Sequence, residues 1–142
     1  LIRDKIPIHS IIAAFNYLKN HEGCTGKIGV VGFCFGGWIS NMMAVKVPEL
    51  AAAVPFYGGQ PTEGIEDINA PLLLQYAGLD ERVNAGWPEY EKKLNELGKE
   101  NTAYFYPKVN HGFHNTSTPR YDEPAAELAW SRTIDFFKEN LM

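Results

Sequence analysis

The sequence predicts an α/β fold, in which a mostly parallel sheet is flanked by helices. Short, almost wholly apolar runs alternate with segments that have the character of helices. Strands buried on both faces have such an apolar composition, and parallel strands need crossovers long enough to hold a helix. The 142 residues contain no repeat and no linker, so we expect a single domain over residues 1–142.

The expected elements follow one another in alternation. Four short runs are predicted as strands because they are apolar or aromatic: 27–31, 51–57, 71–77 and 102–106. A first helix is predicted over 8–18 by apolar residues on one face, and a second over 36–45. A third contains Tyr90, Leu94 and Leu97 and ends at Gly98. A fourth begins after Pro124, with an apolar face made of Trp130, Ile134, Phe137 and Leu141.

Composition argues against several classes of function. Charged residues make up 21% of the chain and the net charge is −4, so nucleic acid is not an expected partner. No apolar segment approaches the roughly 20 residues of a membrane span, and no signal-peptide pattern is present. A cytoplasmic location is the default expectation. The chain begins with Leu1 rather than Met and reads like the later part of a longer protein.

The two cysteines are expected to be free thiols. With the first strand between them, Cys24 and Cys34 would lie about 20 Å apart at about 3.3 Å per residue. A disulfide needs Cα atoms within roughly 7 Å. No Cys-x-x-Cys pair occurs, and only His111 and His114 form a close histidine pair, so no metal site is expected.

Reactive residue types follow the ends of the expected strands. Cys34 comes after the first strand, Tyr57 after the second, Asp80 after the third and His111 after the fourth. In open parallel sheets, ligands bind at the carboxyl ends of the strands. A nucleophile, an acid and a base therefore occur in that order at one edge of the sheet.

The segment Gly32-Phe33-Cys34-Phe35-Gly36 matches the nucleophile elbow, a strained turn from strand to helix. Glycines on both sides would avoid Cβ clashes between strand and helix. The helix N-terminus would favour the thiolate of Cys34, and the N–H of Phe35 would donate to an oxyanion. His111 would act as base and then as acid, while Asp80 would fix its tautomer.

Each of these residues also has a purely structural explanation. An unpaired cysteine beside an apolar run commonly fills a core. Asp80 has the sequence context of a turn residue or a helix cap, and His111 that of a loop residue that forms a hydrogen bond. The elbow spacing, the chain order and the positions after strands together favour the triad.

These motifs resemble those of the dienelactone hydrolases, which have the α/β-hydrolase fold. The matching segments are Gly32-Phe33-Cys34-Phe35-Gly36-Gly37, Tyr57-Gly58-Gly59, Gly78-Leu79-Asp80 and His111-Gly112-Phe113. The resemblance implies a partial α/β-hydrolase fold that lacks the N-terminal strands. It implies a carboxymethylenebutenolidase-type hydrolase of carboxylic esters or lactones, without a cofactor, that uses Cys34, Asp80 and His111 through an acyl-thioester. Tyr57 and Arg82 would be pocket residues.

The chain departs from the family in two respects. It lacks the earlier half, which supplies several strands, a glutamate that contacts the cysteine and the loop with the second oxyanion donor. In addition, Asn115 stands where the family places an arginine that holds the carboxylate of dienelactone. An amide does not replace a bidentate arginine, which disfavours dienelactone itself as the substrate. Arg82 or Arg120 would serve instead, although surface solvation is the commoner role for either.

The missing half also bears on partners. In the family the nucleophile strand lies inside the sheet, so here it would be an edge strand with unpaired backbone groups. We expect a second copy of the chain, or a separate N-terminal fragment, to cover it. Two other functions stay open: a truncated, non-catalytic pseudo-enzyme domain, and a thiol redox sensor, because an activated thiolate is readily oxidised.

Overall fold

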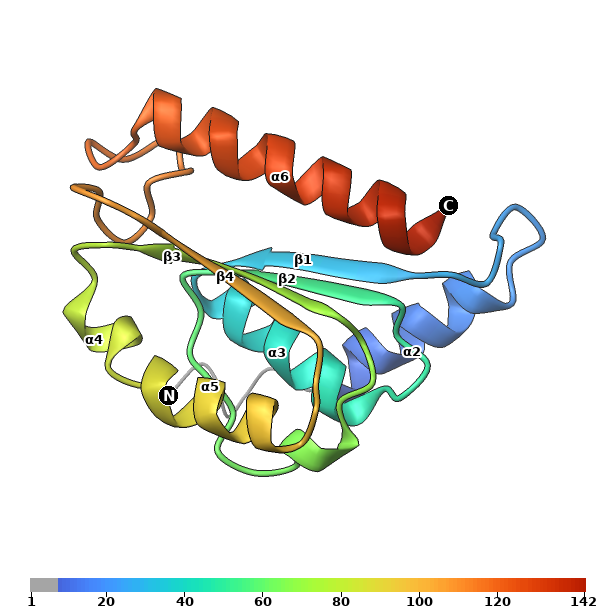
Figure 1. Ribbon diagram of the computed structural model, residues 1–142. Helices are drawn as coiled ribbons and strands as arrows, with labels where there is room; N and C mark the ends of the chain where they lie inside the picture. Colours follow the sequence, from blue (N-terminus) through green and yellow to red (C-terminus); the bar gives the residue numbers. More distant parts are fainter. Residues whose placement is uncertain (1–7) are drawn as a thin grey trace.

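The computed structural model describes residues 8–142 and contains a four-stranded parallel sheet between two layers of helices (Figure 1). The strands are β1 (Gly29–Phe33), β2 (Ala52–Phe56), β3 (Leu72–Ala77) and β4 (Asn101–Tyr106). They lie in the order β1-β2-β3-β4, and each adjacent pair is parallel. The predicted α/β architecture is confirmed, and the chain has a partial α/β-hydrolase fold.

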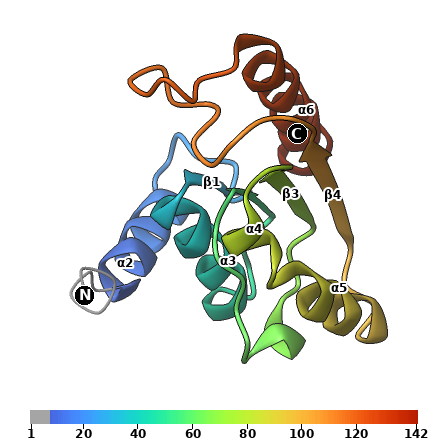
Figure 2. The ribbon, with the colours of Figure 1, turned by 90° about the vertical axis from the view of Figure 1, so that its left-hand side faces the viewer.

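Helices cover both faces of the sheet (Figures 1 and 2). The main helices are α2 (Ile8–Lys19), α3 (Phe35–Lys46), α5 (Trp87–Glu96) and α6 (Glu123–Leu141). On one face, Phe15 of α2, Met43 of α3 and Leu94 of α5 share a buried core. On the other face, Ala129 of α6 packs in a second core with Phe56 and other residues of the sheet.

Two short elements were not predicted. A single turn of 3₁₀ helix, η1 (Ile65–Asp67), precedes β3, and a single turn of α-helix, α4 (Glu81–Asn84), follows it. One turn is too short to show apolar periodicity, and α4 depends instead on its cap at Asp80. The first strand also begins at Gly29, two residues later than expected.

The buried face of α6 differs in part from the predicted one, since Phe137 packs against the core as expected. Trp130 and Ile134 are 40% and 36% exposed, although the sequence pattern placed them on the apolar face. The residues that α6 buries are Ala126, Ala129 and Thr133. The backbone of this helix comes close to the sheet, since the carbonyl of Ala129 accepts a hydrogen bond from the Gln75 side chain. Small side chains permit that approach.

The strand β1, which leads to Cys34, is an edge strand, as expected. Among residues 8–142 it pairs only with β2. All five residues of β1 are half-buried, whereas β2 and β3 are buried throughout. The most buried strands of the sheet are therefore β2 and β3, and the edge at β1 is partly exposed.

Three further findings concern the cysteines, membrane spans and metal sites. Both cysteines are free thiols, as predicted. No helix between residues 8 and 142 combines the length and the apolar character of a membrane span. In the same part of the chain, no three His, Cys, Asp or Glu side chains are arranged to hold a metal ion.

Candidate active site

Cys34 lies at a strained turn between β1 and α3. Its φ is 58° and its ψ is −118°, a conformation that non-glycine residues rarely adopt. Its N–H donates to the carbonyl of Phe56 on the neighbouring strand, at 3.1 Å, and its own carbonyl accepts from Gly37 at 2.9 Å. The surrounding hydrogen bonds thus hold the strained residue in the geometry of a nucleophile elbow.

The glycines around Cys34 allow close backbone contacts. A Cβ atom on Gly32 would lie 2.0 Å from the carbonyl oxygen of Gly36, and one on Gly37 would lie 2.5 Å from that of Phe56. A Cβ on Gly36 would meet nothing within 4 Å. The expected steric need for glycine is therefore confirmed at Gly32 and wrong at Gly36. Gly37 has that need instead, because α3 packs directly on the chain that follows β2.

Asp80 and His111 form a close pair at the ends of the two neighbouring strands β3 and β4. Oδ2 of Asp80 lies 2.6 Å from Nδ1 of His111. Oδ1 of Asp80 accepts a hydrogen bond from the N–H of Val83, 3.2 Å away, and caps α4. Asp80 is only 8% exposed. The cap explanation and the acid–base explanation are therefore compatible, because each uses a different oxygen.

A pocket of about 410 Å³ brings most of the predicted residues together. It is lined by Cys34, Phe35, Tyr57, Gly59, Gln60, Arg82, Val83 and His111. Asp80 does not line it and lies behind His111. In Figure 1, α4 and the segment after β4 lie at the same end of the sheet, as the positions of Arg82 and His111 require. Aromatic residues contribute little else, since Trp87 and Phe113 lie in the cores.

Comparison with known proteins assigns the chain to a family. Residues 3–141 match the model of the dienelactone hydrolase family. The chain belongs to this family. A carboxymethylenebutenolidase, so named, from Saccharolobus solfataricus is 35% identical over 92% of the chain and 51% of its own length. Protein usf of Aquifex pyrophilus is 39% identical over 81% of the chain and 52% of its own length.

Solved structures show the same fold. A Klebsiella pneumoniae protein named as a dienelactone hydrolase superposes with a TM-score of 0.83, at 24% identity, over 92% of the chain and 60% of its own length. The chain spans about half the length of the curated relatives it matches.

In this member of the dienelactone hydrolase family, Tyr57 is a second strained residue beside the elbow. Its φ is 35°, and it is 1% exposed. Its ring meets that of His111 edge to face, with 5.0 Å between centroids. Burial and the nearby Cys34 raise the pKa of the phenol, opposed by a hydrogen bond with the His114 backbone. The Tyr57 phenol is therefore neutral, and its ring packs against the imidazole of His111.

The electrostatic environment of Cys34 corrects one expectation. Burial raises the pKa of the thiol, and the charge of Asp80 adds to that effect. Arg120 and Arg82 act in the opposite direction, Arg120 more strongly, without reversing the rise in pKa. The expected preference for thiolate at the helix end is thus outweighed by desolvation. Burial of Cys34 therefore works against its thiolate form.

Sequence reasoning missed Gly59, Gln60 and Val83 as pocket residues. Gly59 and Gln60 come two and three residues after Tyr57, so their position after a strand was the available signal. Arg120 is close to the site although it lies well beyond the histidine motif. The Cβ position of Gly112, beside His111, is 3.7 Å from Nε of Arg120.

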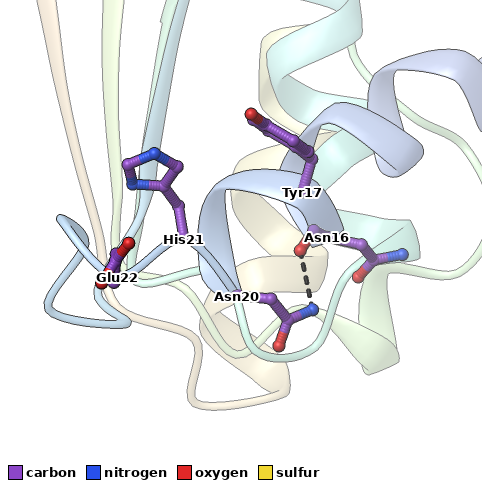
Figure 3. A pocket seen from close by; sticks show the side chains of 5 residues that line it. All are labelled: Asn16, Tyr17, Asn20, His21 and Glu22. Atoms are coloured by element: carbon purple, nitrogen blue, oxygen red, sulfur yellow. Dashed lines mark hydrogen bonds between the residues drawn. The ribbon is translucent and has the colours of Figure 1, made fainter.

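A larger hollow lies elsewhere on the molecule (Figure 3). Its volume is about 630 Å³, and it is lined by Asn16, Tyr17, Asn20, His21 and Glu22 at the end of α2. Tyr17 is 71% exposed, so the hollow is open to solvent. These residues precede β1 and share no lining residue with the Cys34 pocket. The two sites are distinct.

Proposed function

We propose that the chain is a hydrolase of carboxylic esters or lactones, with Cys34 as nucleophile, His111 as base and acid, and Asp80 as its partner. One observation carries this proposal: Cys34 and His111 line the same pocket, while Asp80 holds Nδ1 of His111 at 2.6 Å. With Nδ1 donating to the carboxylate, Nε2 is left to accept a proton. The raised pKa of Cys34 makes such a base necessary.

In the acylation step, Nε2 of His111 takes the proton of the Cys34 thiol as the sulfur attacks the carbonyl carbon. The carbonyl oxygen becomes an oxyanion, and the N–H of Phe35, the first residue of α3, donates to it. When the tetrahedral intermediate collapses, the bond to the alkoxy oxygen breaks. His111 returns the proton to this oxygen, which leaves an acyl-thioester on Cys34.

In the deacylation step, His111 removes a proton from water, and the resulting hydroxide attacks the thioester carbonyl. The carbon–sulfur bond breaks, the acid product leaves, and Cys34 recovers its proton. Asp80 stabilises the imidazolium in both steps without becoming protonated itself. Every proton is carried by His111, and no cofactor takes part.

The pocket favours an ester that carries an anionic group. Asn115 is exposed, and its side-chain oxygen accepts from the N–H of Ser117, so it belongs to a surface turn. Arg82 lines the pocket, and both Arg82 and Arg120 are close enough to Cys34 to lower its pKa. Neither guanidinium has an ion pair within residues 8–142. They are the groups available to hold a substrate carboxylate.

The test is hydrolysis of p-nitrophenyl acetate by the chain and by Cys34→Ala, with mass spectrometry of the quenched reaction. A burst of nitrophenolate with an acetyl adduct on Cys34, absent in the variant, is expected. A folded chain with neither burst nor adduct would be a non-catalytic domain. Peroxide-dependent sulfenylation of Cys34 without turnover would indicate a redox sensor.

A further inference from the structure

The wall of the Cys34 pocket is tied to α3 through one buried amide. Asn41 is 0% exposed and lies two turns after Cys34 on the same helix. Its Nδ2 donates to the carbonyl of Gly59 at 2.9 Å, and its Oδ1 accepts from the hydroxyl of Tyr90 at 3.0 Å. Both ends of the amide are therefore used, and its orientation is fixed by its partners.

The next residue of the wall is tied to α4. Nε2 of Gln60 donates to the carbonyl of Val83 at 2.9 Å and to the hydroxyl of Tyr76 at 3.2 Å. A Cβ atom on Gly86 would lie 2.2 Å from Oε1 of Gln60, so the glycine makes room for this side chain. The N–H of Val83 also donates to Asp80, the residue that caps α4. The peptide between Gly59 and Gln60 is thus held from two sides.

This double attachment fixes the direction of a backbone donor. The described peptides are all trans, and in a trans peptide the C=O and the following N–H point to opposite sides. Since the Gly59 carbonyl points to the buried Asn41, the Gln60 N–H points away from it. Gly59 and Gln60 both line the pocket, and no acceptor within residues 8–142 bonds to this N–H. A fixed donor is available at the pocket wall.

We propose that the Gln60 N–H donates a hydrogen bond to an oxygen of the bound ester, and that Asn41 is the positioning residue that aims it. This inference rests on the proposed function only in taking the Cys34 pocket as the place where the ester binds. A backbone donor that is fixed before binding costs little to order when the ligand arrives.

The first test is ¹⁵N–¹H NMR of the labelled chain during titration with 4′-nitroacetanilide, an amide that resembles p-nitrophenyl acetate and resists hydrolysis. A downfield shift of the Gln60 amide proton, saturating together with shifts at Tyr57 and His111, is expected. Shifts at Tyr57 and His111 without one at Gln60, or no shift in the pocket at all, would overturn the proposal.

The second test compares two isosteric variants that each disturb one buried polar side chain. Asn41→Asp loses the donor to Gly59, and Thr133→Val loses the hydroxyl that bonds to Ala129 and Gln75 on the far side of the sheet. Asn41→Asp is expected to weaken anilide binding about tenfold and to abolish the Gln60 shift. Thr133→Val should leave both unchanged. Equal weakening in the two variants would make Asn41 merely structural.

These results separate the two proposals. A Gln60 shift without turnover of p-nitrophenyl acetate would remove the hydrolase and keep the donor. Turnover without the shift would keep the hydrolase and remove the donor.

Discussion

The two carboxylate oxygens of Asp80 have different partners: Oδ2 lies 2.6 Å from Nδ1 of His111, and Oδ1 accepts from the N–H of Val83. One side chain thus caps α4 and holds the imidazole. A change that removes only one of these roles separates catalysis from stability.

Asp80→Asn is expected to lower kcat for p-nitrophenyl acetate by on the order of 10³ to 10⁴ with little loss of stability. The asparagine oxygen still caps α4, but its NH₂ donates to Nδ1 and leaves the proton on Nε2, which cannot then act as a base. Asp80→Ala should lose the activity and also about 1 kcal/mol of cap energy in urea unfolding. Equal activity of Asp80→Asn and the natural chain would remove Asp80 from the mechanism.

Arg120→Gln is expected to raise the pKa of the Cys34 thiol further, because Arg120 is the strongest influence that lowers it. The pH profile of Cys34 alkylation by iodoacetamide should move to higher pH, so that the rate at pH 8 falls. Arg82→Gln should shift the profile in the same direction by a smaller amount, and the distant Lys99→Gln should not shift it. A profile unchanged in Arg120→Gln would contradict this order.

Gly36→Ala and Gly37→Ala form a matched pair one residue apart at the start of α3. The Cβ position of Gly36 is open, and alanine is the better helix former, so Gly36→Ala should leave stability unchanged or raise it by up to about 1 kcal/mol. Gly37→Ala forces a Cβ against the backbone of Phe56 and Gly58, and is expected to unfold at clearly lower urea concentration. Similar urea midpoints for the two would show that the backbones can separate.

The stability of the fold is expected to depend on pH through His114. Its ring stacks on Phe33 at 5.0 Å and lies 5.6 Å from Trp130, and burial lowers its pKa from 6.5. Between the lowered pKa and 6.5 the unfolded chain binds more protons, so stability falls as the pH falls through this window. His114→Phe should reduce the loss of urea midpoint between pH 7.5 and 5.5. An equal loss in both chains would exclude His114 as a source.

The open edge at β1 leads to a prediction about association. We propose that a second copy of the chain covers it. The strand β1 is only half-buried. Next to it, the ring of His114 contacts both Phe33 of β1 and Trp130, which is 40% exposed. Sedimentation equilibrium should show a mass that rises with concentration, and Trp130→Glu should reduce the association. A single monomeric species at about 100 µM would contradict the proposal.

The sheet was predictable from the sequence because strands that are buried on both faces are almost wholly apolar. β2 is apolar throughout and β3 is apolar except for Gln75, and their bounds agree with the expected runs to within one residue at each end. The sequence predicted Phe137 on the inner face of α6, but not the buried Ala126, Ala129 and Thr133, which are small because helix and sheet lie close together. Large apolar residues such as Trp130 dominate a periodicity pattern even where they are exposed.

The sequence predicted the features of the site that depend on the order of residues along the chain. It did not predict those that depend on how the site residues are packed. The positions of Asp80 and His111 after neighbouring parallel strands sufficed to bring them together. The raised pKa of Cys34 follows from burial, which no local pattern reveals. Gln60 likewise has its place because of Val83 and Tyr76, which are distant in the sequence.

The regular succession of β1 to β4 also has a consequence for biosynthesis. The strands lie in the sheet in the order in which a ribosome synthesises them, and His111 comes after the last strand. A nascent chain released before β4 would carry Cys34 and Asp80 without His111, the group that we propose moves protons between sulfur and substrate. Under the proposed mechanism, a chain cut short before β4 would therefore be inactive, even though most of the sheet is present.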